Sequence, residues 1–368
     1  MEILDAIMPT EISLDYLLSN VGIRNHICMK KIIITILILI AIAAAYIGWK
    51  IFGPTLHSPT DKYLYIKTGS NYQDVKNNLL QKEIITSEFL FDKLAKQAKY
   101  DKLVKAGRYE ITNGMSLYNL IRMLKSGSQA PVRLVINKLR TKEDLAKKIG
   151  QQFECDSLDA ISFLNNNDSL KNYGLDTQTV MTAVIPNTYL INWNYSFKKL
   201  FSTLKKEEEK FWNKERKQKA ADKKLAPAQV YIMASIVEEE SNKLKDKPLI
   251  ASVYINRINK GMKLEADPTV KYAMRDFGLK RILYAHLSYP SSYNTYQNTG
   301  LPPGPICTPS AQTIDAVLDA PQTDYIFFVA KPDFNGYSNF ASTYTEHLKF
   351  AKAYQQALDE LIKKKQAQ

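Results

Sequence analysis

Cysteine is scarce in this chain of 368 residues, and the few copies follow no recognisable framework. The three cysteines, Cys28, Cys155 and Cys307, form no CxxC pair and lack the spacing of metal ligands. We therefore expect neither a disulfide framework nor a cysteine metal site. Internal repeats at solenoid spacing are also missing, which argues against a repeat architecture. The chain is too long for one small core, so two or three folded units are expected.

The balance of charge is basic, with a formal net charge of +13 that comes mainly from lysine. Much of this lysine is interleaved with glutamate between residues 205 and 224, in the run KKEEEKFWNKERKQKAADKK. We interpret this run as the solvated face of a helix, in preference to a nucleic-acid patch. The remaining positive excess favours anionic lipid headgroups or an acidic polymer as partners, and no nucleic acid is expected.

Charge is absent from eighteen consecutive residues near the N-terminus, Ile32 to Trp49. As a helix, this run spans about 27 Å, close to the thickness of the hydrocarbon layer of a membrane. The alternatives are a cleaved signal peptide and a buried core helix. Tyr46 and Trp49 suit a membrane interface and no small-residue cleavage pattern follows, so the sequence favours an uncleaved anchor. We predict a cytoplasmic start and a transmembrane helix over residues 29–52.

The orientation of this anchor follows from the charges before it. Arg24, Lys30 and Lys31 precede the apolar run, and positively charged flanks tend to stay in the cytoplasm. Everything after about Phe52 is then expected outside. Residues 1–28 show no clear periodicity, and Met29 followed by two lysines resembles a natural start, so we interpret residues 1–28 as a mis-called extension.

The exported part begins with a juxtamembrane linker at residues 53–60, GPTLHSPT. Residues 61–137 then alternate between strand-like and helix-like stretches in the order strand, helix, helix, strand, helix, and PVRLVIN near the end of this segment reads as a further strand. This order predicts a small α+β module similar to a lysin-motif carbohydrate binder.

A second, larger unit is expected over residues 138–357, followed by a lysine-rich tail at 358–368. Several helical stretches precede Pro227, which suits the first turn of a helix. The fold class is therefore α+β, with a single N-terminal transmembrane helix, the small module and a larger mixed α+β domain.

The helix that begins at Pro227 ends in three adjacent carboxylates, within ASIVEEES. Its apolar residues cover nearly all sides, so we expect it to be buried. A carboxyl group held against apolar neighbours has a raised pKa, as a general acid requires. The alternative is that Glu238, Glu239 and Glu240 merely end the helix, although negative charge there opposes the helix dipole. The helical wheel alone leaves Glu238 and Glu240 tied.

The following sequence carries several distinctive elements. Together with ASIVEEES they comprise ASVYINRINKGMKLEADPTVKY, YNTY, GLPPGPI and a TEH that ends at His347. This ordered set resembles the MltG-type (YceG-like) endolytic murein transglycosylases. The likeness covers the anchor, the lysin-motif-like module and the second unit, so that only residues 1–28 and the tail lie outside it.

The resemblance implies a catalytic glutamate directly after ASIV, which is Glu238 here. Glu240 also matches a family position, and we assign it a supporting role in the site. Glu239 is expected to face solvent. Two positions depart from the family pattern: Glu265 stands where glutamine is usual, and Ser338 where histidine is usual.

The implied reaction cleaves the β-1,4 bond between N-acetylmuramic acid and N-acetylglucosamine inside glycan strands of peptidoglycan. One carboxyl group suffices, because the C6 hydroxyl of the substrate itself attacks the anomeric carbon and leaves a 1,6-anhydro end. No cofactor or metal is implied. The expected location is the bacterial inner membrane, with the catalytic part outside the cytoplasm and peptidoglycan synthases as further partners.

Supporting residues are expected around the glutamates. Aromatic rings and an amide from YNTY could bind sugar, and Asn256 and Arg257 are interpreted as orienting the glutamate helix or the ADPT turn. Asp267 in that turn has a structural reading as an Asx turn. His286 and His347 are read as structural. The expected substrate-binding residues are Tyr293, Asn294 and Tyr296.

Two other functions stay open. A hydrolytic muramidase would use a second carboxylate, Glu265 or Asp267. A catalytically silent scaffold would bind glycan and recruit cell-wall synthases.

Overall fold

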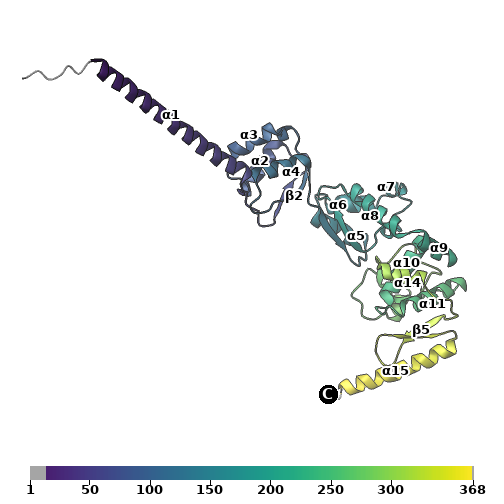
Figure 1. Cartoon of the computed structure of the whole chain (residues 1–368). Coiled ribbons are helices and arrows are strands. Elements are labelled where there is room, and N and C mark those ends of the chain that lie inside the picture. Colours follow the sequence, from purple (N-terminus) through teal and green to yellow (C-terminus); the bar gives the residue numbers. More distant parts are fainter. Residues whose placement is uncertain (1–13, 367–368) are drawn as a thin grey trace, which may run out of the picture. The chain divides into compact units, whose positions relative to one another are not determined.

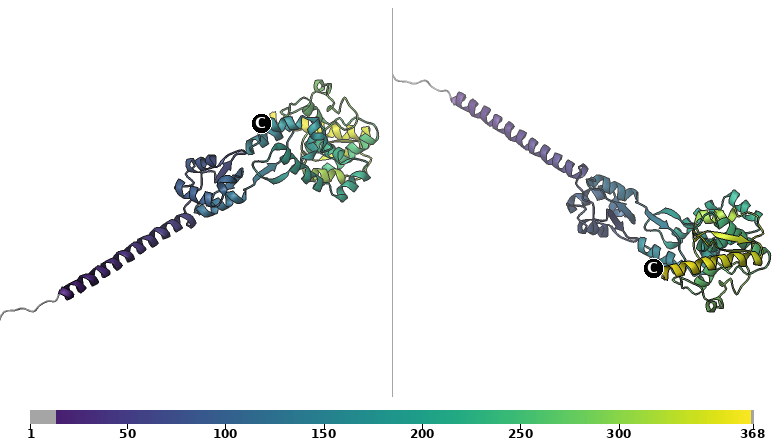
Figure 2. Two further views of the ribbon diagram at one scale, coloured as in Figure 1. Left: turned by 90° about the horizontal axis from the view of Figure 1, so that it is seen from above. Right: turned by 90° about the horizontal axis from the view of Figure 1, so that it is seen from below.

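The fold is described from a computed structural model of the chain, which covers the backbone of residues 14–366 and the side chains of residues 29–364 and 366. The predicted extension at residues 1–28 lies entirely outside these described side chains. The chain divides into two compact units, residues 1–130 and 131–368. Figure 1 labels the elements, and Figure 2 shows them from two further sides.

The first unit opens with helix α1 (Leu14–Phe52). Among the described residues, its segment Met29–Phe52 is the one stretch long and apolar enough to cross a membrane, and none of it is buried in the protein. Strands β1 (Tyr63–Ile66) and β2 (Gly107–Glu110) pair antiparallel. The remaining elements are α2 (Tyr72–Gln81), α3 (Glu88–Gln97), the short η1 (Tyr100–Lys102) and α4 (Leu117–Ser126).

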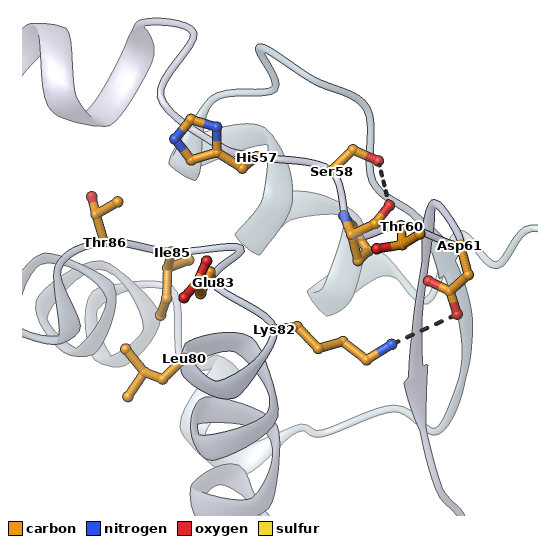
Figure 3. A pocket seen from close by; sticks show the side chains of 10 residues that line it. His57, Ser58, Thr60, Asp61, Leu80, Lys82, Glu83, Ile85 and Thr86 are labelled. Atoms are coloured by element: carbon orange, nitrogen blue, oxygen red, sulfur yellow. Dashed lines mark hydrogen bonds and ion pairs between the residues drawn. The ribbon is translucent and has the colours of Figure 1, made fainter.

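The expected linker at residues 53–60 is packed rather than free. Leu56 lies in the core of the first unit, and its backbone exchanges hydrogen bonds with Gly114 and Met115. His57 and Thr60 of this segment line an open hollow beside the end of α2, where Lys82 forms an ion pair with Asp61 at 3.7 Å (Figure 3). The chain therefore passes from α1 into the folded module without a flexible spacer.

The second unit begins earlier than expected. Strand β3 (Val132–Ile136), which we placed in the first module, pairs antiparallel with β4 (Asn187–Ile191) and so belongs to the second unit. A core of these strands and the surrounding helices supports the first half of this unit. Those helices are α5 (Lys142–Gln152), α6 (Ser157–Leu164), α7 (Asn167–Lys171), η2 (Val180–Ala183) and α8 (Phe197–Phe211).

The lysine- and glutamate-rich run forms two helices instead of one. Helix α8 ends at Phe211, and α9 (Lys214–Asp222) begins after Asn213, whose side chain accepts a hydrogen bond from the backbone of Arg216. An asparagine at this position stabilises a new helix start, which explains the break.

A second core surrounds α10 (Pro227–Glu240), the helix that carries the glutamates. Helices α11 (Lys247–Asn259) and α14 (Ala311–Leu318) pack against it, and Pro227 starts it as predicted. In the sequence, α11 and α14 are separated by two short helices, α12 (Asp267–Ala273) and α13 (Tyr284–Leu287).

The chain closes with a hairpin and a long helix. Strands β5 (Phe327–Ala330) and β6 (Ser338–Ala341) pair antiparallel, and α15 (Tyr344–Gln366) packs along them (Figures 1 and 2). The predicted tail at residues 358–368 therefore continues this helix as far as the structure describes it.

Candidate active site

Helix α10 is a core helix whose last turn carries three carboxylates. Every residue from Val230 to Val237 is buried, as the sequence predicts. Since successive residues of a helix project about 100° apart, Glu238, Glu239 and Glu240 leave the helix in three directions. The three side chains consequently have three different environments, and these environments give each carboxyl group different chemical properties.

Glu240 lines a cavity at the end of α10. This cavity has a volume of about 390 Å³ and lies between the end of α10, the chain before α12, strand β5 and helix α15. The hydroxyl group of Tyr254, from α11, donates a hydrogen bond of 2.9 Å to Oε1 of Glu240. The other residues that line the cavity are Arg257, Leu264, Glu265, Asp267, Tyr296, Phe327, Phe328, Tyr344 and His347.

The surroundings of Glu240 favour its protonated form. Burial raises the pKa of the Glu240 carboxyl to about 7, and the negative charge of Asp267 adds to this effect. The hydrogen bond from Tyr254 and the positive charge of Lys271 act in the opposite direction but are outweighed. At neutral pH a large fraction of Glu240 therefore carries a proton that it can donate.

Arg257 holds the loop that forms one wall of the cavity. Its Nη1 donates to the backbone oxygen of Leu264 at 2.9 Å and contacts a carboxylate oxygen of Glu265 at 3.1 Å. Its Nε donates to the backbone oxygen of Ile326 at 2.8 Å, next to β5. These contacts fit the predicted role of Arg257 in orienting the approach to the ADPT turn. Asn256 is likewise structural, since its Nδ2 donates to backbone oxygens just before β5.

Asp267 and Tyr296 form a polar pair at the cavity. The hydroxyl group of Tyr296 donates to Oδ1 of Asp267 at 2.7 Å. Asp267 occupies the first position of α12 and, contrary to the expected Asx turn, directs its carboxylate toward Tyr296. The structure thus brings Tyr296, Asp267 and Glu265 together with Glu240.

The two other residues expected to bind substrate do not line this cavity. Asn294 is fully buried (0% exposed), and its Nδ2 donates to the backbone oxygens of Leu287 at 3.0 Å and Tyr289 at 2.8 Å. Its amide is therefore committed to shaping its own loop, and the expectation that it reads an N-acetyl group is wrong. Tyr293 packs on Tyr272, with ring centroids 4.7 Å apart, and also lies outside the lining of the cavity.

Glu238 has a different environment from the one its sequence suggests. Its Oε2 accepts hydrogen bonds from Nζ of Lys247 at 2.9 Å, from the hydroxyl of Ser310 at 3.1 Å and from the hydroxyl of Thr313. Burial alone would raise the pKa of this carboxyl, but the bonds from Thr313 and Lys247 outweigh burial and lower it. The expectation of a raised pKa at Glu238 is therefore wrong.

Glu239 does not face solvent, contrary to the expectation. It forms ion pairs with Lys138 at 2.8 Å and Arg140 at 3.1 Å, and only 17% of its side chain is exposed. These contacts lower its pKa in spite of burial, which alone would raise it. The expected exposure is corrected, because Lys138 and Arg140 lie more than ninety residues earlier and the helical wheel could not include them.

Sequence reasoning treated His347 as structural, yet it lies at the cavity. Its ring stacks on Phe327, with centroids 5.1 Å apart, and burial followed by the charge of Arg257 lowers its pKa. Within the described residues, its Nδ1 is buried without a hydrogen-bond partner. The sequence feature that could have indicated a place at the site is the TEH element, which ends at His347. Ser338 lies outside the cavity lining, and its backbone N–H donates to Asp246 at 2.7 Å.

Comparison with known proteins identifies a family and several relatives. The model of the YceG-like family matches residues 64–353. An endolytic murein transglycosylase of Bacillus subtilis is 30% identical over 329 residues, covering 83% of this chain and 90% of the relative. One of Streptococcus pneumoniae is 27% identical, with 82% of this chain and 61% of that longer protein covered.

A solved structure is similar as well. The crystal structure of a YceG-like protein from Listeria monocytogenes is 27% identical and matches with a TM-score of 0.52. The match covers 79% of this chain and 99% of the Listeria chain. With most of its length matched by the family model, by relatives and by this structure, the chain belongs to the YceG-like family.

Proposed function

We propose that this chain is a membrane-anchored lytic transglycosylase that cuts glycan strands of peptidoglycan internally. The observation that carries the proposal is Glu240, a carboxyl group with a pKa of about 7 in a cavity lined by polar and aromatic side chains. The names of the relatives, endolytic murein transglycosylases, support the same reaction. The resemblance placed the acid at Glu238, but the geometry favours Glu240, because Glu238 is held as a carboxylate by Lys247.

The proposed reaction proceeds through a single carboxyl group. Glu240 donates its proton to the oxygen that links N-acetylmuramic acid to N-acetylglucosamine, while the bond from that oxygen to the anomeric carbon breaks. The C6 hydroxyl oxygen of the muramic acid then bonds to the anomeric carbon and releases its proton to the Glu240 carboxylate. The acid is regenerated, no water is consumed, and the product carries a 1,6-anhydro end.

The neighbouring residues have supporting roles in this proposal. Tyr254 holds the Glu240 carboxyl in one orientation, and burial, with a smaller contribution from Asp267, keeps the pKa of Glu240 high. The aromatic rings of Tyr296 and Tyr344 offer faces against which sugar rings can pack. Arg257 fixes the wall that contains Glu265, so that its role is positional.

The products distinguish this reaction from hydrolysis. Asp267 and Glu265 line the same cavity as Glu240, which keeps a hydrolytic muramidase as a second candidate. We expect mass spectrometry of a peptidoglycan digest by the full chain to show anhydro ends only. A run in ¹⁸O-labelled water serves as control, and incorporation of the label at the new ends would contradict the transglycosylase.

The pH dependence of cleavage should report the pKa of Glu240. Only the protonated form starts the reaction, so the rate should fall about tenfold per pH unit once the pH exceeds about 7. Asp267→Asn removes a charge that raises this pKa, and the alkaline limb should move to lower pH. Lys271→Met removes a charge that lowers it, and the limb should move to higher pH. Shifts in the same direction for both variants would contradict the assignment.

The anchoring and the small module complete the proposal. We propose that Met29–Phe52 crosses the inner membrane with the N-terminus in the cytoplasm, which leaves both folded units outside. The order of β1, α2, α3 and β2 supports the proposal of a lysin-motif-like module, which would hold a glycan strand for cutting. Such cuts would release or terminate new strands beside the synthases that make them.

A further inference from the structure

A second cavity lies in the first unit, at the end of the apolar helix. It has a volume of about 330 Å³ and is bounded by Phe52, the end of α3 and one side of α4. Tyr118, Ile121 and Lys125 recur on α4 at spacings of three and four residues, so they form a single stripe that faces the cavity. This cavity is separate from the one that contains Glu240.

The walls of this cavity are apolar and exposed. Phe52 is 67% exposed and Tyr118 is 47% exposed, and their rings contact each other with centroids 5.4 Å apart. Exposed aromatic side chains of this size are unfavourable in water but typical of a membrane interface. Tyr46 and Trp49 of the same helix are also exposed, within the two turns before Phe52. The aromatic band of α1 is therefore continuous with the cavity wall.

The rim of the cavity is positively charged. Arg122 and Lys125 are exposed side chains on the α4 stripe. Among the side chains that the structure describes, no carboxylate lies within ion-pairing distance of either. Lys50 adds a third positive charge at this end of α1, where its Nζ lies over the ring of Trp49 at 5.7 Å. Apolar walls with a cationic rim are complementary to an amphiphile that has a negatively charged head.

We propose that this cavity binds one phospholipid with an anionic headgroup. The acyl chain packs against Phe52, Tyr118 and Ile121, and the phosphate group lies between Arg122 and Lys125. The inference rests on the proposed crossing of the membrane by α1, which places the cavity at the headgroup level. The bound lipid seats the first unit on the membrane surface.

The test uses the full chain in nanodiscs that contain equal amounts of phosphatidylglycerol and phosphatidylcholine. After gentle extraction, native mass spectrometry counts the lipids that remain bound. Two cations near an anionic headgroup correspond to about a thirtyfold preference, so we expect one retained phosphatidylglycerol per chain. Arg122→Glu with Lys125→Glu should abolish this preference.

A matched control separates a site from general attraction. Lys67 is exposed on the same unit and outside the cavity, so Lys67→Glu changes the net charge as much as Lys125→Glu does. We expect Lys125→Glu to reduce the retained phosphatidylglycerol and Lys67→Glu to leave it unchanged. Equal losses in both variants, or equal retention of both lipids by the original chain, would overturn the site. A dimer that the double substitution dissociates would assign the cavity to a second copy instead.

The anchoring is checked separately by alkaline extraction of membranes that contain the full chain. Release of the chain would reject the anchor, and the lipid site with it. Retention of the chain without a lipid preference would reject the site alone and leave the anchor standing.

Discussion

Substitution of Glu240 by glutamine is expected to lower the rate of peptidoglycan cleavage by a factor of about 10² to 10⁴. Glutamine keeps the size of the side chain and can still accept the hydrogen bond from Tyr254, but it neither donates nor takes up a proton in the reaction. The loss should appear in kcat, since the shape of the cavity is retained. The measurement is the release of muropeptides from purified peptidoglycan by the full chain in detergent.

Glu238→Gln is the informative comparison, because the resemblance assigned the acid to that position. We expect this variant to keep the alkaline limb of the pH profile and much of the activity of whatever fraction folds. Loss of activity in a folded Glu238→Gln protein, together with an active Glu240→Gln protein, would reverse the assignment. Full rescue of a deletion strain by Glu240→Gln would instead support the scaffold function.

Substitution of Lys247 by methionine is expected to lower the free energy of unfolding by about 3–5 kcal/mol. The ammonium group of Lys247 and the carboxylate of Glu238 are both largely buried, with 6% and 16% of their side chains exposed. Removal of the lysine leaves a buried negative charge without its counter-ion. Thermal unfolding of the full chain in detergent measures the effect.

Two further variants show whether the pair itself is responsible. Replacing both partners, as Lys247→Met with Glu238→Leu, should recover much of the lost stability, because no unpaired charge then remains. Lys219→Met breaks an exposed pair with Asp319 and should change stability by no more than about 1 kcal/mol. Similar losses from Lys247→Met and Lys219→Met would contradict the importance of burial.

The sequence was sufficient to predict the glutamate helix and the family, but not to distinguish its carboxylates. Apolar residues on all sides and Pro227 at the start predicted a buried α10, which the structure confirms. The choice between Glu238 and Glu240 depends on partners from other helices. Thr313, which binds Glu238, lies 75 residues further along the chain, and a helical wheel contains no such information.

The roles of the residues in the YNTY loop could not be predicted from the sequence alone either. A tyrosine or an asparagine in YNTY could face a sugar or its own loop, and the residue type alone does not decide between them. The backbone turns so that Tyr296 reaches the cavity while Asn294 bonds to the oxygens of Leu287 and Tyr289. Arg257 was predicted to orient the glutamate helix or the ADPT turn, and it bonds to a backbone oxygen just before that turn.

The cavity around Glu240 takes residues from α10 and also from α15. During translation, the segment that contains Glu240 leaves the ribosome about a hundred residues before Tyr344 and His347 do. A nascent chain thus contains Glu240 before it contains the residues of α15 that complete the cavity. The order of synthesis therefore delays the proposed cutting activity until α15 has been made.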